Sequence, residues 1–290
     1  MNDAKQCKSL DIGSALGALA AKECQSLEHA LALRKGRHDG IHEARKSSRR
    51  LRSLLAFLEP RSDRRIASLD KTLKQLVDSF SALRDAHVAA RTARLLAATH
   101  AATLTPSLMD ALEHRSAALL DEALENDPHW RRRSAKVRRI AVAIEGLPWQ
   151  QVTPSTAKKV LKQHVQRMKK VRQAALEERT TPAFHRWRRR ARQVRYQLEF
   201  LRTARRKVGM KKRRTEQYEA RIKRLSLLSD RLGWRQDFQV FMSALDQLPA
   251  SIDIVALRAA LSTKSATLSK VSPPEPVTKS VRMFIAHGSR

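Results

Sequence analysis

The positions of the prolines constrain the fold of this chain more than any other feature of its sequence. Proline lacks a backbone N–H and clashes inside a helix, so it is found at helix starts and in connections. Seven prolines fall between amphipathic stretches and never within one: Pro60, Pro106, Pro128, Pro148, Pro154, Pro182 and Pro249. No stretch between them shows the two-residue alternation with β-branched residues that is typical of a strand. The sequence therefore predicts an all-α protein.

Apolar residues that recur at steps of three and four mark the predicted helices. The expected helices cover residues 11–33, 41–59, 63–100, 107–127, 129–145, 155–178, 184–206, 211–246 and 252–268. The sequence VSPPEPVTKS follows them at residues 271–280, and this composition is typical of a disordered tail. We therefore expect one folded domain over residues 1–270 and a disordered tail over residues 271–290.

The chain carries a large and unevenly distributed positive charge. It has 59 Lys and Arg residues against 28 Asp and Glu residues, a formal net charge of +31. Residues 151–290 hold 33 basic and 10 acidic residues, so most of the excess lies in the second half. Such a charge attracts polyanions, namely nucleic acid, an anionic membrane surface or inorganic polyphosphate.

Cysteine usage and hydropathy bear on localisation. The two cysteines, Cys7 and Cys24, fit neither a disulfide scaffold nor a metal site, so a reducing cytosol is expected. No run approaches the roughly eighteen apolar residues that a membrane helix needs. Residues 12–21 faintly resemble the apolar part of a signal peptide, but Asp3 and Asp11 flank them and the helical pattern continues beyond them. We interpret this segment as the first helix of a cytoplasmic protein without a membrane partner.

The sequence contains no motif of a familiar catalytic class. It lacks the Gly-x4-Gly-Lys-Ser/Thr phosphate loop, the His-Glu-x2-His zinc motif and the Gly-x-Ser-x-Gly nucleophile elbow. His38 and His42 are four residues apart, as metal ligands can be, but the intervening Asp39-Gly40 is typical of a turn. Phosphate-ester hydrolysis ordinarily uses metal-binding carboxylates, and no such pair stands out. We therefore expect neither enzymatic activity nor a metal or other cofactor.

One short basic helix is a candidate binding element. The segment IHEARKSSRRLRSLLAFL (residues 41–58) has a continuous apolar stripe. At 100° per residue, four potential cations fall in an arc beside that stripe: His42, Arg45, Arg49 and Arg52. Like charges about 5–6 Å apart on a helix repel one another unless solvent or an anion compensates them. Taken alone, this helix fits a solvated basic face as well as an anion site.

A second segment repeats this pattern. At an offset of 143 residues, FHRWRRRARQVRYQLEFL (residues 184–201) places four cations at the same positions: His185, Arg188, Arg192 and Arg195. Downstream, residues 73–88 align with residues 225–240 at an offset of 152, which pairs Asp85 with Asp237. A solvated face has no reason to keep one His-x2-Arg-x3-Arg-x2-Arg register twice. The repetition therefore predicts an internal duplication and a common binding role for both helices.

The doubled motif, with an Arg-Asp or Gln-Asp helix after each copy, resembles the CHAD domain, the conserved histidine α-helical domain. The resemblance covers about residues 10–262 and implies two pseudo-symmetric four-helix bundles around a basic central groove or pore. The first repeat then spans about residues 10–147 and the second about residues 155–262. The family also implies binding of inorganic polyphosphate, in some members on polyphosphate granules. Some relatives carry a triphosphate-tunnel domain, but its Glu-x-Glu-x-Lys signature is absent, so a stand-alone binding domain is expected.

Carried over position by position, the resemblance assigns polyphosphate binding to the motif residues. They are His42, Arg45, Arg49, Arg52, His185, Arg188, Arg192 and Arg195. Lys46 and Arg189 match a further basic position of the motif.

Other basic residues are candidates for the same groove. Lys74 occupies a basic family position in the first half, whereas the aligned residue of the second half is Ser226. Three nearby cations are candidate substitutes there: Arg221, Lys223 and Arg224. A further pair shares one face of the predicted helix over residues 155–178 and is expected to complete the groove wall: Lys162 and Lys169.

We expect a protein that binds polyphosphate through these residues. Sequence-nonspecific binding of RNA or DNA is the alternative, because phosphate contacts alone attract nucleic acid to so basic a chain. The two motif histidines add a pH dependence. Neighbouring cations lower the pKa of a histidine, whereas a bound phosphate raises it, so binding is predicted to tighten as the pH falls toward 6.

Overall fold

The computed structural model describes residues 11–58, 63–99, 105–209 and 212–248. All regular structure in these ranges is helical, so the predicted all-α class is confirmed. The long helices are α1 (Ile12–Ala32), α2 (Arg37–Leu55), α3 (Arg64–Asp78), α4 (Ser81–Thr99), α5 (Pro106–Asn126), α6 (Arg131–Glu145), α7 (Pro154–Glu178), α8 (Thr181–Lys207) and α9 (Lys212–Leu245). Short 3-10 turns cover Ala56–Leu58, Pro128–Trp130 and Trp149–Gln151. The helix predicted over residues 252–268 and the tail predicted over residues 271–290 lie outside the described residues.

Local sequence explains where the helices begin. The Asp11 carboxylate accepts a hydrogen bond of 2.8 Å from the backbone N–H of Ser14, which caps α1. Thr153 caps α7 in a reciprocal arrangement with Thr156, and Thr180 caps α8. A proline follows each of these two threonines within the first turn, where its missing N–H leaves no donor unsatisfied.

The structure corrects two predictions. Asp39-Gly40, interpreted as a turn, lies in the first turn of α2. Residues 63–100 were expected to form one helix, but α3 ends at Asp78 and α4 begins at Ser81. The Ser79 hydroxyl donates to the Leu76 carbonyl at 2.9 Å, which closes the last turn of α3. Phe80 is fully buried at the break, edge-on to Trp130 with ring centroids 5.6 Å apart. Burial of this aromatic ring therefore outweighs the helical continuity that the sequence pattern suggests.

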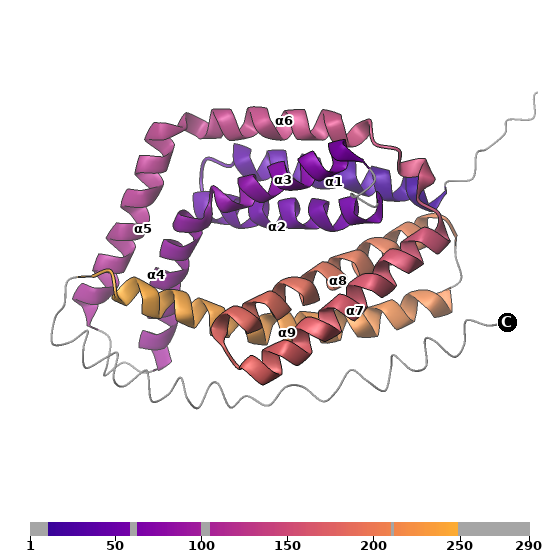
Figure 1. Ribbon diagram of the computed structural model, residues 1–290. Helices are drawn as coiled ribbons and strands as arrows, with labels where there is room; N and C mark the ends of the chain where they lie inside the picture. Colours follow the sequence, from indigo (N-terminus) through magenta and orange to yellow (C-terminus); the bar gives the residue numbers. More distant parts are fainter. Residues whose placement is uncertain (1–10, 59–62, 100–104, 210–211, 249–290) are drawn as a thin grey trace, which may run out of the picture. The chain divides into compact units, whose positions relative to one another are not determined.

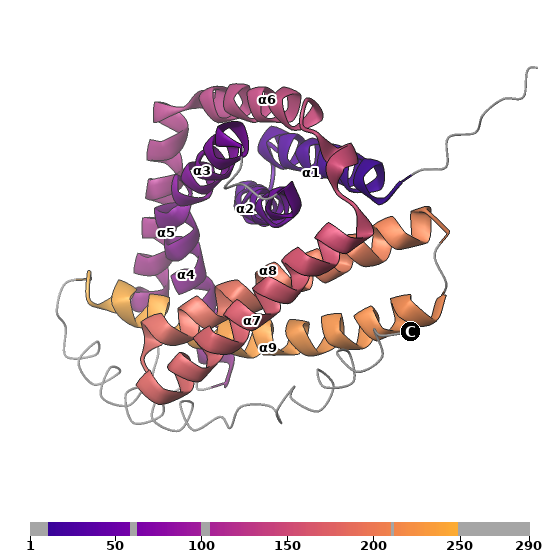
Figure 2. The same cartoon turned by 45° about the vertical axis from the view of Figure 1, so that its right-hand side comes forward.

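The two helices with the repeated motif pack against each other. Contacts join α2 to α1 and α3, and α8 to α7 and α9, while α2 and α8 also touch directly (Figures 1 and 2). Helix α4 contacts α2, α5 and α9, so it connects the two groups at one end. At the contact between α2 and α8, the Gln197 amide donates to the Ser53 carbonyl at 3.3 Å and its oxygen lies 2.9 Å from His164 Nδ1. This packing brings residues some 140 positions apart in sequence into one region.

Candidate anion-binding site

Six of the predicted binding residues gather where α2 and α8 face each other. With Arg84 of α4 they form what we call the central cluster: His42, Arg45, Arg49, Arg84, His185, Arg188 and Arg192. Arg192 lies within electrostatic reach of every other member. The helix pair therefore assembles the two copies of the motif into one site rather than two.

Arg45 is held rigidly at the end of α3. It is 8% exposed, and its Nη1 donates to the Val77 carbonyl at 2.6 Å and to the Ser81 hydroxyl at 3.2 Å. At the break between α3 and α4, this carbonyl accepts the Phe80 N–H at 3.4 Å in addition to the bond from Arg45. Burial, and then the charge of Arg84, lowers the pKa of Arg45 to about 10, so the guanidinium stays charged at neutral pH.

Arg188 occupies the corresponding place against α9. Its Nε donates to the Ser229 carbonyl at 3.1 Å and its Nη1 to Gln236 Oε1 at 2.6 Å. Burial, and then the charge of Arg192, lowers the pKa of Arg188 to about 10.

The partners of these two arginines are related by the sequence repeat. Arg45 and Arg188 are 143 residues apart, and their carbonyl acceptors on Val77 and Ser229 are 152 residues apart. These are the two offsets that align the halves of the sequence. The correspondence supports the predicted internal duplication.

Arg49 and Arg192 are the least compensated members of the cluster. Both are partly buried, and neither forms a hydrogen bond or an ion pair with any residue in the described ranges. Burial, and then the charge of Arg192, lowers the pKa of Arg49 to about 9, and burial also lowers the pKa of Arg192. Two partly buried guanidinium groups that repel each other and have no carboxylate partner form a site that an anion would stabilise.

Arg84 is a member of the cluster that the sequence comparison did not single out. Its Nη1 donates to Asp85 Oδ1 at 2.8 Å and its Nη2 to Asp237 Oδ1, so it connects α4 to α9. It also repels four other arginines of the cluster, namely Arg45, Arg49, Arg188 and Arg192. The sequence contains one indication of Arg84, because it directly precedes Asp85, the residue that aligns with Asp237. Its contact with α9 depends on the fold and does not follow from that alignment.

The two motif histidines lie at the edge of the cluster. Loss of solvent lowers the pKa of His42 even though part of its side chain is exposed, and Lys46 and Arg49 lower it further. The pKa of His185 is lowered by burial and by Arg189, and a hydrogen bond to Gln236 opposes the shift. Both rings are therefore largely neutral near pH 7 and can gain a proton when an anion arrives.

Several predicted binding residues are engaged in ion pairs with carboxylates. Arg52 forms a two-pronged ion pair with Asp70, with N–O distances of 2.8 and 2.9 Å. Lys46 pairs with Glu43 at 3.0 Å on the surface. Arg195 donates to the Ser226 hydroxyl at 2.9 Å and lies 3.6 Å from Glu199. Ser226 is the residue aligned with Lys74, and a lysine there would place a second cation against Arg195.

The remaining candidates lie farther out. Lys74, Lys162, Arg189 and Arg224 are exposed, while Lys169 and Arg221 are partly buried. Of these six residues, Arg189 affects the cluster electrostatically through His185. Within the described ranges, no hydrogen bond or ion pair connects Lys74, Lys162, Lys169 or Arg224 to the cluster, and their binding role stays a prediction.

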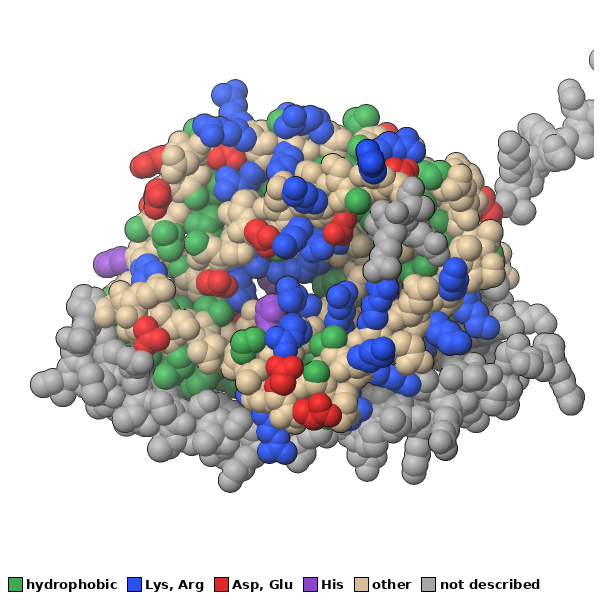
Figure 3. All heavy atoms as spheres, in the orientation of Figure 1, with side chains coloured by type: hydrophobic (Ala, Val, Ile, Leu, Met, Phe, Trp, Pro, Cys, Tyr) green, Lys and Arg blue, Asp and Glu red, His purple; other side chains and the backbone are tan. Residues whose placement is uncertain are grey.

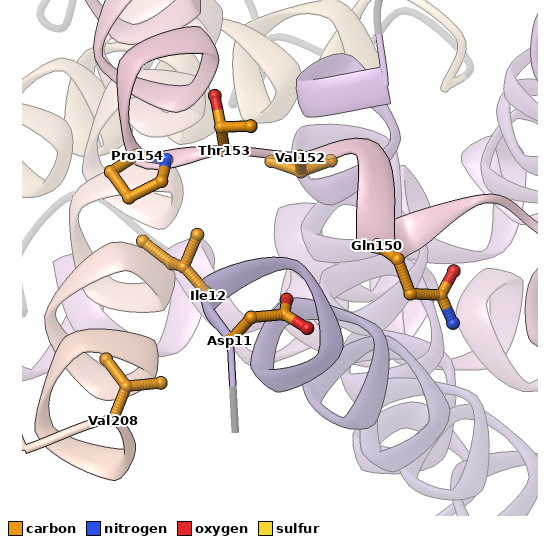
Figure 4. Close-up of a pocket in the computed structure, with 7 residues that line it drawn as sticks. All are labelled: Asp11, Ile12, Gln150, Val152, Thr153, Pro154 and Val208. Carbon is orange, nitrogen blue, oxygen red and sulfur yellow. The ribbon is translucent and has the colours of Figure 1, made fainter. Parts of the chain in front are cut away.

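The space-filling view shows an accessible hollow at this place. Figure 3 shows the face hollowed between α2 and the α7–α8 pair, with Lys, Arg and His side chains gathered around the opening. Two other cavities of about 300 Å³ lie elsewhere. The cavity between the starts of α1 and α7 is lined by the Asp11 carboxylate, two neutral polar side chains and four apolar ones, a set without a cation for an anion (Figure 4). The cavity between α3 and α6 has two cations at its edge, Lys136 and Arg139.

The described residues contain neither a metal-binding group nor a membrane-spanning helix. No group of three or more His, Cys, Asp or Glu side chains there could hold a metal ion. No helix in the same ranges is long and apolar enough to cross a membrane.

Comparison with known proteins agrees with the all-α fold and with the resemblance to the CHAD domain family. The sequence model of the CHAD domain family matches residues 18–246. Among solved structures, the chain is similar to the CHAD domain from the plant Ricinus communis, with 19% identity and a TM-score of 0.60 over 97% of this chain and 93% of that chain. At this identity the similarity concerns the fold. No curated protein matched the chain.

Proposed function

The chain belongs to the CHAD domain family, and on that premise we propose that it binds inorganic polyphosphate at the central cluster. The observation that carries the proposal is the pair Arg49 and Arg192, whose guanidinium groups repel each other electrostatically and have no carboxylate partner among the described residues. A group with two or more anionic oxygens can bond to both guanidinium forks at once. The protein then acts as a binding module of the cytoplasm that associates with polyphosphate granules and carries out no catalysis.

The surroundings of the pair suit a repeating phosphate chain. Arg45 and Arg188 are fixed by backbone carbonyls, so little side-chain entropy is lost when they bind phosphate. Each of them also lies within electrostatic reach of Arg192. A flexible chain with about one charge per phosphate can meet successive cations without presenting a base or a sugar.

Nucleic acid is the alternative ligand, because its phosphates respond to the same charge. Single-stranded nucleic acid is usually bound with aromatic side chains on which the bases stack. In the described part of the chain, Trp187 and Tyr196 on α8 are buried, whereas Phe184 is partly buried beneath Arg235 and Trp234 on α9 is 37% exposed. The choice between the two ligands therefore rests on the doubled cation register and on direct competition, not on the aromatic side chains.

A competition titration at near-physiological salt tests the proposal. Labelled long-chain polyphosphate is bound to the wild-type protein and challenged with duplex DNA, RNA and pyrophosphate at equal phosphate concentration. We expect nucleic acid to compete only at a large excess of charge. Competition by DNA or RNA charge for charge would instead identify a diffuse basic surface.

Arg49→Gln combined with Arg192→Gln tests the site itself. Because each variant removes a charge-assisted contact worth about 1.5–3 kcal/mol, we expect the double variant to bind polyphosphate about 100-fold or more weakly. The matched control is Arg131→Gln with Arg138→Gln, which removes the same charge from exposed positions on α6. An equal loss in both double variants would contradict a defined site.

A further inference from the structure

Resting on the proposed function, we propose that Arg84 is a positioning residue that holds two aspartates away from the arginines that bind polyphosphate. Asp85 and Asp237 lie inside a cluster whose task is to attract anions, so each competes with the ligand for a guanidinium group. Arg84 binds both carboxylates at once, one from α4 and one from α9. It thereby neutralises the local carboxylates. Among the described residues, four arginines of the cluster are left without a carboxylate partner: Arg45, Arg49, Arg188 and Arg192.

The surroundings of Arg84 favour this role over direct contact with ligand. Each of its two terminal nitrogens already donates to a carboxylate. The guanidinium group therefore cannot also bind a phosphate through both of these nitrogens. The Arg84 side chain is 18% exposed, whereas the two carboxylates are more open, at 48% for Asp85 and 31% for Asp237. The aspartates thus have room to turn once Arg84 is removed.

The arginines that would capture the released carboxylates can be named. Asp85 already attracts Arg45, and Asp237 already attracts Arg188 and Arg192. Two exposed aspartates lie farther along the same surfaces, Asp78 near Arg45 and Asp230 near Arg188. Without Arg84, the two released carboxylates are expected to pair with Arg45 and Arg188. These two guanidinium groups, which the backbone holds best, are then no longer available to polyphosphate.

The test is a cycle of polyphosphate affinities at fixed pH and salt. We expect Arg84→Gln to bind about tenfold or more weakly than the wild type. Adding Asp85→Asn and Asp237→Asn to Arg84→Gln should restore most of that affinity. The same two substitutions in the wild-type protein should change affinity far less, because Arg84 already neutralises these carboxylates. This unequal effect of the aspartates in the two backgrounds is the result that the proposal requires.

Matched controls separate this role from simple charge counting. Arg138→Gln removes one exposed positive charge from α6, and Asp121→Asn with Glu125→Gln removes two exposed negative charges from α5. If Arg84→Gln costs no more than Arg138→Gln, the proposal is overturned. It is equally overturned if the remote carboxylate pair restores binding as well as the local pair does. A loss that persists after both aspartates are neutralised would mean that Arg84 contacts the ligand itself.

Folding and the proposed function are controlled separately. Thermal unfolding checks each variant, and Arg84→Lys replaces Arg84→Gln in the cycle if the latter does not fold, because a lysine keeps the charge but cannot bridge both carboxylates in the same way.

A wild-type protein that binds no polyphosphate would overturn the proposed function alone. The role of Arg84 is then decided by unfolding measurements on Asp237→Asn and Arg188→Gln. Their energetic coupling should be small in the wild type and should grow in Arg84→Gln, and an unchanged coupling would contradict the proposal.

Discussion

Gly233 determines how Arg188 reaches the backbone of α9. A Cβ atom at this position would lie 2.5 Å from Nη2 of Arg188, closer than any side chain tolerates. Gly233 is also the residue that aligns, at the offset of 152, with Ser81, whose hydroxyl accepts a hydrogen bond from Arg45. In one half a hydroxyl completes the arginine site, and in the other an absent side chain makes room for it.

Replacement of Gly233 by alanine should therefore affect binding more than folding. The added methyl group displaces the end of a flexible side chain, and alanine favours the helix by about 1 kcal/mol, so we expect little loss of stability. Displacement of Arg188 from Ser229 should weaken polyphosphate binding about tenfold. Gly146→Ala is the control, because its Cβ would meet no atom closer than 3.8 Å. Unchanged affinity in Gly233→Ala would show that the position of Arg188 is unimportant.

The motif histidines should couple binding to proton uptake. The pKa values of His42 and His185 are lowered in the free protein, and a bound phosphate raises them. Affinity should therefore increase as the pH falls from 8 toward 6, by at most about tenfold per pH unit for each proton taken up. Calorimetry in two buffers of different ionisation enthalpy measures the uptake directly.

The variant His42→Gln with His185→Gln should flatten this pH profile. The control is His29→Gln with His114→Gln, two exposed histidines outside the cluster. A wild-type affinity that does not change between pH 6 and 8 would contradict a role for either motif histidine in binding.

At the scale of elements, the sequence predicts most helices within a few residues and misses the break between α3 and α4. Proline and capping residues are local signals, and they mark the starts of α5, α7 and α8 correctly. No proline or glycine marks the break at Ser79 and Phe80. It depends on Trp130 from a distant turn, and on Arg133, which lies 5.0 Å above the Phe80 ring. The periodicity of a single segment carries no information about these partners.

A pair of stacked histidines makes the contact between α2 and α4 sensitive to pH. The rings of His38 and His87 lie 4.0 Å apart and nearly parallel. Burial, and then the charge of His38, lowers the pKa of His87 to about 4 from its ordinary value of 6.5. The folded state therefore prefers the neutral ring. The neutral His87 ring therefore contributes its full stabilisation above pH 6.5, and this contribution is lost as the pH falls toward 4.

We expect His87→Gln to lose less stability on acidification than the wild type does. The difference between pH 7 and pH 4.5 should be about 1–2 kcal/mol, since solvent screening reduces the effect for a partly exposed ring. Chemical unfolding across this pH range measures it, with His29→Gln as control. Parallel stability profiles for the wild type and His87→Gln would contradict the assignment.

At the scale of the molecule, the contact between α2 and α8 around Arg50, here called the seam, holds the site together. Arg50 donates to Glu23 at 2.8 Å and to Glu199 at 2.5 Å, and its guanidinium lies 4.5 Å above the Phe200 ring. It therefore ties α1, α2 and α8 at one point. Unlike Arg49, its neighbour in sequence, Arg50 has its charge compensated by two carboxylates.

Arg50→Met should destabilise the fold by about 2–4 kcal/mol, because two largely buried carboxylates lose their partner. Adding Glu23→Gln and Glu199→Gln should recover part of this loss. Arg65→Met is the control, since its exposed pair with Asp63 is screened by solvent and should contribute far less. Thermal and urea unfolding give both values. Equal losses in Arg50→Met and Arg65→Met would contradict a structural role for this seam.

The candidate site was predictable from sequence only in part. Repetition of one register in two segments picks out the motif positions, and the structure brings six of the eight into the central cluster. It places Arg52 against Asp70 and Arg195 against Ser226. These pairings, and the two contacts of Arg84, depend on which helices become neighbours. A repeat within the sequence identifies equivalent positions, but it does not identify the residues that these positions contact in the folded protein.

The uncompensated pair Arg49 and Arg192 also has a consequence for the life of the protein in the cell. Their mutual repulsion opposes folding whenever the site is empty, and a ligand that binds only the folded chain removes that penalty by mass action. The occupied protein unfolds less often and so meets proteases less often. The steady-state amount of the protein would then rise and fall with the supply of its polyanion, without any change in the rate of its synthesis.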